Sequence, residues 1–202
     1  MYPDLNILFI IDPGHGKDTP GKRSPVWPDG RQLFEWEVNR AIVSRISKTL
    51  SKEGIFHIWT TLSKYDMPLS HRVGLANEQL EDTAHVIFVS IHSNAGGGTG
   101  WEVFTSKGNT DSDKYAEIFF EEMKHEFPDM RFRSDMLDGD SDKEENFYVL
   151  KYTDCPAVLT ENFFMDTLTP DCEILMSEDG RDKIADAHVR AIRKIYNMLK
   201  NN

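Results

Sequence analysis

The sequence predicts an α/β fold in three layers, in which a largely parallel mixed sheet carries helices on both faces. Short apolar segments of strand type alternate along the chain with longer segments of helical period, which is typical of layered α/β proteins. The first strand segment, "NILFII", has no polar residue after Asn6, as expected of a central strand covered on both sides. The chain has 202 residues and neither an internal repeat nor a long linker, so we expect one domain over residues 1–202.

The first half of the chain supplies two strands and two helices. Residues 6–11 form the first strand, and a Pro/Gly-rich loop, "TPGKRSPVWPDG", leads to a helix over residues 35–53. Apolar residues recur in this helix at three- and four-residue steps: Val38, Ala41, Ile42, Ile46 and Leu50. Gly54 is expected to end the helix as its C-cap, before a second strand at residues 55–61. Ser70 is expected to be the N-cap of a helix over residues 69–83.

The second half continues the alternation of strands and helices. Strands are predicted at residues 85–92 and 101–105, on either side of the flexible loop "AGGGTG". A helix over residues 111–127 is ended by Pro128. An exposed acidic loop, "DMLDGDSDKEE", precedes a short strand at residues 157–160, and residues 180–200 form a long amphipathic helix.

The composition argues against several classes of function. The formal net charge of −11 disfavours nucleic acid or an anionic membrane surface as a partner. Two cysteines, Cys155 and Cys172, are too few for a disulfide framework or a thiolate zinc site. No apolar run approaches the roughly 18 residues of a membrane span, so membrane insertion is not expected. The N-terminal segment lacks a basic region, and we expect a core strand there and no signal peptide.

Four polar residues stand at the ends of predicted elements, where ligands bind in sheets of this type. His15 follows the first strand within "IDPGHG", and His92 closes the strand at residues 85–92. Glu161 closes the strand at residues 157–160, and Glu35 opens the first helix. Each has an ordinary explanation alone, such as a histidine in a turn or a carboxylate favoured by the helix dipole. Together they predict a metal site.

Two imidazoles and a carboxylate suit catalytic zinc, which takes nitrogen and oxygen ligands and keeps one position for water. Zinc lowers the pKa of that water and polarises a carbonyl group. A second carboxylate can carry the proton from water to a leaving amine. The spacing leaves open which glutamate has which role. Because the H-E-x-x-H motif is absent, the ligands must come from distant segments.

Other candidate residues have weaker patterns. Three tryptophans flank the proposed site in the sequence and belong either to a substrate groove or to the core: Trp27, Trp36 and Trp101. Three histidines lie on predicted helices among polar neighbours, where a solvated face is expected: His71, His125 and His188.

Several segments match one known family in order and over most of the chain. They are "IDPGHGKDTPG", "FEWEVNRAIVSRISKTL", "LSHRVGLANEQLEDTAHVIFVSIHSNAG", "CPAVLTENFF" and "IADAHVRAIRKIY". On these segments the chain resembles the zinc-dependent N-acetylmuramoyl-L-alanine amidases of the amidase_3 type. Those enzymes cleave the bond between muramic acid and the stem peptide of bacterial peptidoglycan. The resemblance implies a hydrolase with a phosphorylase/hydrolase-like three-layer fold.

The resemblance also implies roles for individual residues. It implies that His15, Glu35 and His92 bind Zn²⁺ and that Glu161 is the catalytic carboxylate. Three further residues are implied to have supporting roles, two in the family helix and one near the groove: Arg72, Asn77 and Glu102. The chain departs from the family after Glu161, where Asn162 replaces the usual glycine and "MD" replaces the usual ending. These departures affect the expected groove shape and leave the four chemical positions intact.

Two other functions remain open on the sequence alone. One is a zinc peptidase acting on stem peptides with the same site, and the other is a non-catalytic module that binds the cell wall. The chain suits a phage endolysin released at lysis or a secreted autolysin, and it is expected to act as a monomer. The segment at residues 131–146 is the candidate for a regulatory element that blocks the groove.

Overall fold

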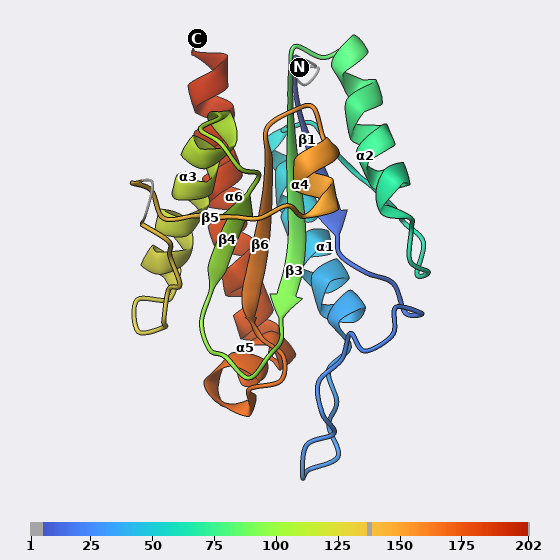
Figure 1. Ribbon diagram of the computed structural model, residues 1–202, viewed down its shortest axis with the longest axis vertical. Helices are drawn as coiled ribbons and strands as arrows, with labels where there is room; N and C mark the ends of the chain where they lie inside the picture. The colour runs from blue at the N-terminus through green and yellow to red at the C-terminus, as the bar shows by residue number, and fades with distance from the viewer. Residues whose placement is uncertain (1–5, 137–138, 202) are drawn as a thin grey trace.

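The sheet is mixed and largely parallel, as the sequence predicts. The computed structural model describes residues 6–136 and 139–201. Within them, six strands form one sheet in the order β2-β1-β3-β6-β4-β5 (Figure 1). Four strands are parallel: β1 (Ile7–Pro13), β2 (His57–Trp59), β3 (His85–Asn94) and β6 (Ala157–Phe164). Strand β4 (Glu102–Thr105) runs antiparallel to β6, and β5 (Lys143–Glu144) pairs parallel to β4.

Helices cover both faces of the sheet, which confirms the three-layer prediction. One face packs against α1 (Glu35–Glu53), α3 (Asp111–Glu126) and α6 (Glu178–Lys200). The other face carries α2 (Leu69–Glu78) and α4 (Tyr148–Tyr152). Successive side chains of a strand point to opposite faces, so β1 serves both cores. Its Phe9 belongs to the larger cluster and its Leu8 to the smaller one.

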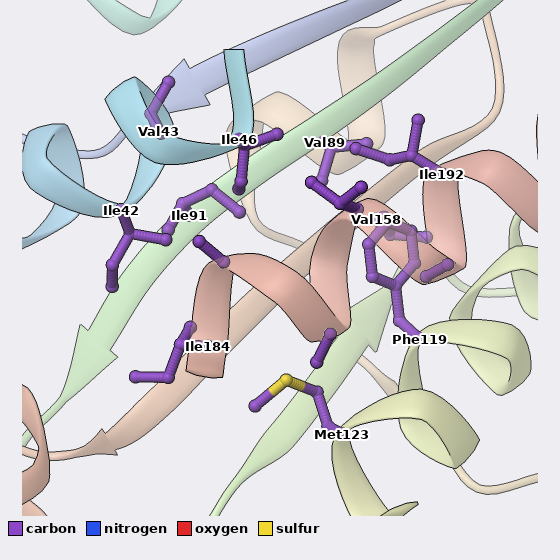
Figure 2. Close-up of a cluster of buried hydrophobic side chains, with 14 of the residues drawn as sticks. Ile42, Val43, Ile46, Val89, Ile91, Phe119, Met123, Val158, Ile184 and Ile192 are labelled. Carbon is purple, nitrogen blue, oxygen red and sulfur yellow. The ribbon is translucent and has the colours of Figure 1, made fainter. Parts of the chain in front are cut away.

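The larger core is formed by aliphatic and aromatic side chains from the sheet and three helices. Figure 2 shows Val89 and Ile91 of β3 and Val158 of β6 facing side chains of α1, α3 and α6. The smaller core, under α2 and α4, covers less of the sheet. The short cover on this face leaves the carboxyl ends of the parallel strands open to a pocket.

Several boundaries differ from the prediction for identifiable reasons. The N-cap of α2 is Pro68 and not Ser70, because the Pro68 carbonyl already accepts hydrogen bonds from the backbone of His71 and Arg72. Helix α2 ends at Glu78 and is followed by a short 3-10 helix, η1 (Gln79–Glu81), and does not reach residue 83. Gly54 is the predicted C-cap of α1, with a left-handed φ of 71°.

Strands β1, β3 and β6 run further than their apolar residues suggest. Strand β6 continues to Phe164, because Glu161 still pairs with His92 of β3 and with Glu102 of β4. Glu161 therefore lies within the strand and does not close it. After β6 the chain enters η2 (Leu168–Cys172) and α5 (Glu173–Met176), which the sequence did not indicate.

The segment at residues 131–146 lies along the β4 edge of the sheet. Phe132 pairs with Trp101, and β5 extends the sheet beside β4. Residues 137–138 are outside the described part, and none of the segment's described residues lines the pocket. Over residues 6–136 and 139–201, no helix combines the length and apolarity that crossing a bilayer requires.

Candidate metal centre

The pocket lies where the parallel strands end, on the face covered by α2 and α4. Its floor contains His15, His92 and Glu161, and Lys22 and Arg72 also line it. Phe147 and Tyr148 form part of its wall at the start of α4. Three of the four sequence-predicted residues thus line a pocket at the position where a doubly covered parallel sheet binds its ligands, and the fourth, Glu35, is fully buried.

Sheet register brings distant residues together. His92 of β3 is directly opposite Glu161 of β6, and Glu161 is also opposite Glu102 of β4. His15 leaves β1, which is the other neighbour of β3. Glu35 is the first residue of α1, and its backbone N–H donates to the carbonyl of Lys22 at 3.1 Å. Two strand ends and one helix start therefore aim at the same space.

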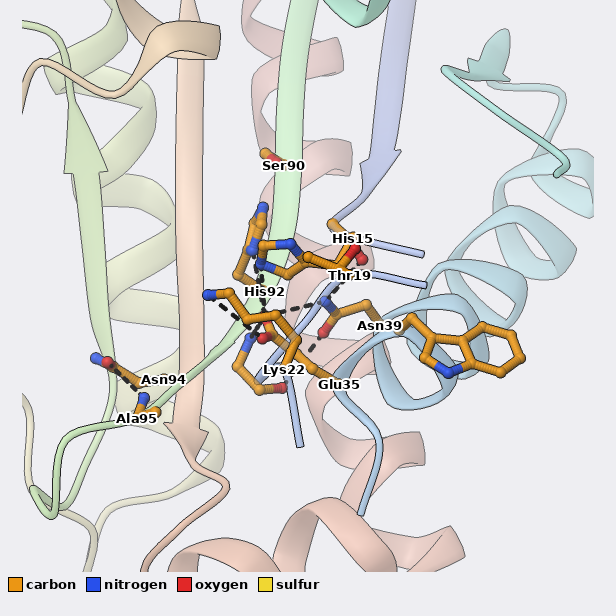
Figure 3. Close-up of polar contacts among 12 residues, drawn as sticks. His15, Thr19, Lys22, Glu35, Asn39, Ser90, His92, Asn94 and Ala95 are labelled. Atoms are coloured by element: carbon orange, nitrogen blue, oxygen red, sulfur yellow. Dashed lines mark hydrogen bonds and ion pairs between the residues drawn. The ribbon is translucent and has the colours of Figure 1, made fainter. Parts of the chain in front are cut away.

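His15, Glu35 and His92 form a group of three donors whose ligand atoms lie within 4.8 Å of one another. The distance from Glu35 Oε1 is 3.5 Å to His15 Nε2 and 3.2 Å to His92 Nδ1. The two imidazole rings are nearly perpendicular, with centroids 4.8 Å apart (Figure 3).

Two atoms of this group are buried without a hydrogen-bond partner: His15 Nε2 and Glu35 Oε2. Buried polar atoms are normally satisfied, so orphaned atoms on two of the three clustered donors indicate a missing partner. Two nitrogen donors and one carboxylate are the ligand set that zinc takes at catalytic sites. The residues present therefore fit a zinc ion.

The turn after β1 is built to bring His15 and His92 close. A Cβ placed on Gly14 would stand 2.2 Å from His92 Cε1, so only glycine leaves room for that ring. His15 itself has a positive φ of 61°, an uncommon conformation for a residue with a side chain. The shape of the "DPGHG" turn thus directs the His15 ring toward Glu35.

Two residues that the sequence did not single out hold the Glu35 carboxylate. The backbone N–H of Ser93 donates to Glu35 Oε1 at 3.1 Å, and Asn39 Nδ2 approaches the same oxygen at 3.4 Å. Asn39 also donates to the Gly14 carbonyl at 3.2 Å and accepts from the Ser93 hydroxyl at 3.3 Å. Asn39 lies one helical turn after Glu35, which is the signal that could have indicated it.

Burial and neighbouring charges shift the pKa of every group in this cluster. Burial raises the pKa of Glu35, but its hydrogen bond with His92 and the charges of His92, His15 and Lys22 outweigh burial, and the pKa falls to about 2. Burial and the charge of His92 lower the pKa of His15 to about 4. Burial lowers the pKa of His92, but its hydrogen bond with Glu35 and the charges of Glu161 and Glu35 outweigh burial and raise it. The Glu35 carboxylate and the neutral His15 imidazole are thus in the states that bind a metal, whereas His92 releases its proton when it becomes a ligand.

Glu161 has the opposite shift. Burial raises its pKa to about 8, the charge of Glu35 adds to this, and the charge of His92 opposes it. Its Oε2 is buried without a hydrogen-bond partner. A carboxylate with a raised pKa, beside the candidate ligands and in the pocket, is suited to proton transfer.

Glu102 lies next to Glu161 across the β4–β6 pair and is almost completely buried. Its carboxylate accepts from Asn94, from Lys143 and, at 3.0 Å, from Arg133. It supports the sheet beside the pocket and does not line it.

Arg72 forms a buried ion pair with Asp12, a residue that the sequence reasoning missed. Asp12 also accepts from the hydroxyls of Thr60 and Ser90, at 2.5 and 2.6 Å. Arg72 further donates to the Pro13 carbonyl and to Asp66, each at 2.9 Å. This network fixes the end of β1 immediately before the turn that carries His15.

Asn77 contacts a different part of the fold. It donates to the Tyr152 carbonyl at 3.1 Å and accepts from the Asp154 backbone at 2.9 Å, which joins α2 to the end of α4.

Trp101 belongs to the core, one of the two alternatives that the sequence left open, and the prediction of a solvated His188 is wrong. The three tryptophans are absent from the pocket lining, and Trp101 is fully buried, with Nε1 donating to Asn162 at 2.9 Å. His188 is fully buried against the sheet, where Nε2 lies 3.0 Å from the Thr160 hydroxyl. Its helix packs one face on the core, and the polar neighbours in sequence occupy the other face. His71 and His125 are exposed, as predicted.

Known proteins resemble this chain over nearly its whole length. The Amidase_3 family model, described as N-acetylmuramoyl-L-alanine amidase, matches residues 9–194. The N-acetylmuramoyl-L-alanine amidase CwlM of Bacillus licheniformis is 32% identical over 196 residues, covering 96% of this chain and 71% of that protein. The endolysin of Bacillus phage SPP1 is 27% identical over 200 residues, covering 98% of this chain and 69% of its own.

A solved structure has the same architecture. The crystal structure of an N-acetylmuramoyl-L-alanine amidase from Clostridium difficile 630 superposes with a TM-score of 0.81 at 26% identity, covering 96% of this chain and 98% of that one.

Proposed function

This chain belongs to the N-acetylmuramoyl-L-alanine amidase family of the Amidase_3 type, and on that premise we propose how its residues hydrolyse the bond between N-acetylmuramic acid and L-alanine in peptidoglycan. The observation that carries the proposal is the convergence of His15, Glu35 and His92 at a pocket that His15, His92 and Glu161 line. In this proposal the first three residues hold zinc, and Glu161 is the catalytic carboxylate.

Zinc bound there would supply a water of lowered pKa and polarise the scissile carbonyl. Asn39 and the Ser93 N–H hold the Glu35 carboxylate in place, and the Gly14 turn does the same for the His15 and His92 rings. Such positioning matters, because a misplacement of about 1 Å at a catalytic group can cost about a hundredfold in rate.

Glu161 moves the proton. It stands across from His92 in the sheet register and lines the same pocket as His15 and His92. It accepts a proton from the attacking water and donates it to the nitrogen of the leaving L-alanine. A neighbouring cation lowers the pKa of a carboxyl group, so zinc held by His15, Glu35 and His92 would lower the pKa of Glu161 from about 8 toward the range where it is ionised at neutral pH.

The proposal is tested by digestion of purified peptidoglycan with the zinc-loaded protein, followed by mass analysis of the fragments. We expect new L-alanine N-termini and free lactyl carboxyl groups on muramic acid. New N-termini within the stem peptide would show a peptidase instead, and a protein that neither binds zinc nor releases fragments would be a wall-binding module.

A Glu161→Gln variant separates chemistry from metal binding. We expect it to keep one zinc per chain and to lose activity by about 10²- to 10⁴-fold, the usual contribution of a positioned acid–base group. Glu145→Gln, at an exposed position in the loop before α4, is the matched control and should retain parental activity. Digestion by Glu161→Gln at the parental rate would remove Glu161 from the mechanism.

A further inference from the structure

Lys22 occupies a fixed position beside the candidate metal centre. Its backbone carbonyl accepts the N–H of Glu35 at 3.1 Å, and the next residue, Arg23, pairs with Phe34 in an antiparallel bridge. The loop is therefore anchored on both sides of the point where α1 begins. Figure 3 shows the Lys22 side chain extending from this anchor toward His92 and Glu35.

The Lys22 ammonium forms one long ion pair at the site, with the Glu35 carboxylate. Nζ lies 3.8 Å from Glu35 Oε2, beyond the 2.7–3.2 Å range of a hydrogen bond, and Glu35 Oε2 has no hydrogen-bond partner. Arg72, the other Lys or Arg side chain of the pocket, is 1% exposed and is occupied by Asp12 and Asp66. The Lys22 side chain is 41% exposed, so its charge is available to a molecule in the pocket.

The positive charge of Lys22 repels a cation bound at this place and so weakens metal binding. An anion that binds Lys22 would offset this repulsion. When a divalent cation occupies the three donors, the charge of Glu35 is neutralised, and Glu161 is then the carboxylate of the site whose charge still interacts with Lys22. Lys22 would therefore attract an anionic group of the substrate. In peptidoglycan the lactyl carboxyl group of muramic acid is consumed in the scissile amide, so the anions near that bond belong to the stem peptide.

We propose that Lys22 binds a carboxylate of the stem peptide on the leaving, L-alanine side of the scissile bond. The enzyme then prefers stem peptides whose second residue has a free α-carboxylate over stem peptides in which that group is amidated. This assignment rests on the proposed function. It makes Lys22 a specificity-determining residue that forms a charge-assisted hydrogen bond with the substrate and does not take part in proton transfer.

The test uses two muramyl dipeptides that differ only in a free or amidated α-carboxyl group on the second residue. We expect the zinc-loaded parental protein to have a KM about tenfold lower for the carboxylate form, the range of one charge-assisted hydrogen bond. Lys22→Met should raise KM for the carboxylate form about tenfold and for the amide form far less, so that the preference disappears. Lys22→Arg should keep the preference.

Lys17→Met is the matched control, because Lys17 is exposed, places its ammonium 4.0 Å from the Tyr65 ring centroid and does not line the pocket. It should leave the preference unchanged. A parental protein with equal KM for both dipeptides, or a Lys22→Met variant that loses activity equally on both, would overturn the assignment.

Binding of the free L-alanyl peptides, measured by calorimetry on the zinc-loaded protein, separates this inference from the proposed function. If the protein cleaves neither muramyl dipeptide, the amidase proposal fails, but a Lys22-dependent preference for the peptide with the free carboxylate still supports the assignment. Equal affinity of the parental protein for the two peptides would refute the assignment even if the muramyl bond is cleaved.

Discussion

The close approach of Gly14 to His92 allows a quantitative prediction for Gly14→Ala. The added Cβ would stand 2.2 Å from His92 Cε1, whereas carbon atoms pack at about 3.5 Å or more, so the ring or the turn must shift by about 1.3 Å. His92 cannot yield freely, because its ring contacts Glu35 at 3.2 Å and meets the His15 ring edge-to-face.

The expected consequences follow from that shift. Overpacking at a buried site costs about 1–3 kcal/mol of unfolding free energy. A ligand displaced by more than about 1 Å no longer shares the metal with its neighbours, so we expect zinc affinity and turnover each to fall by about a hundredfold. The variant should fold, because the strain is confined to one turn.

The assay compares zinc affinity, by competition with a chromophoric chelator, with thermal unfolding and peptidoglycan digestion. Gly74→Ala is the control: it makes the same substitution within α2, where an added Cβ meets nothing within 4 Å. That control should be neutral or stabilise the fold by up to about 1 kcal/mol. Parental zinc affinity and activity in Gly14→Ala would refute the claim that this glycine makes room for His92.

Three further predictions concern stability. Removal of zinc with a chelator should lower the melting temperature, because a ligand at a thousand times its Kd contributes about 4 kcal/mol; an unchanged melting temperature would mean that the folded protein holds no metal. Arg72→Met should lower the free energy of unfolding in urea by about 3–5 kcal/mol, because it leaves Asp12 charged and buried. A loss smaller than that caused by Asp12→Asn would contradict this reasoning. Burial lowers the pKa of His188 to about 4, so the unfolded chain takes up a proton at this residue before the folded protein does. The free energy of unfolding should therefore fall by about 3 kcal/mol from this residue as the pH drops from 6.5 to 4. Chemical unfolding at each pH should show a shallower decline for His188→Gln.

The amino-acid pattern was sufficient for the fold class and for the places where chemistry gathers. Apolar runs such as residues 86–91 are recognisable as strands because successive side chains point to opposite faces and all are buried. His15 and His92 could be singled out because a polar residue at the carboxyl end of a buried apolar run lies at the edge where ligands bind. Helix ends with local causes, such as the left-handed Gly54, were also predictable.

Tertiary structure decided what depends on pairing between distant segments. The spacing left open which glutamate joins the two histidines; in the fold Glu35 lies with them, while the strand register sets Glu161 across from His92. The burial of His188, the charge pair of Arg72 and Asp12, and the access of Lys22 to the pocket have no local signature. Each of these features arises because side chains from separate helices and strands pack against one another. The contacts that stabilise them join residues far apart in the sequence, so the sequence alone does not reveal them.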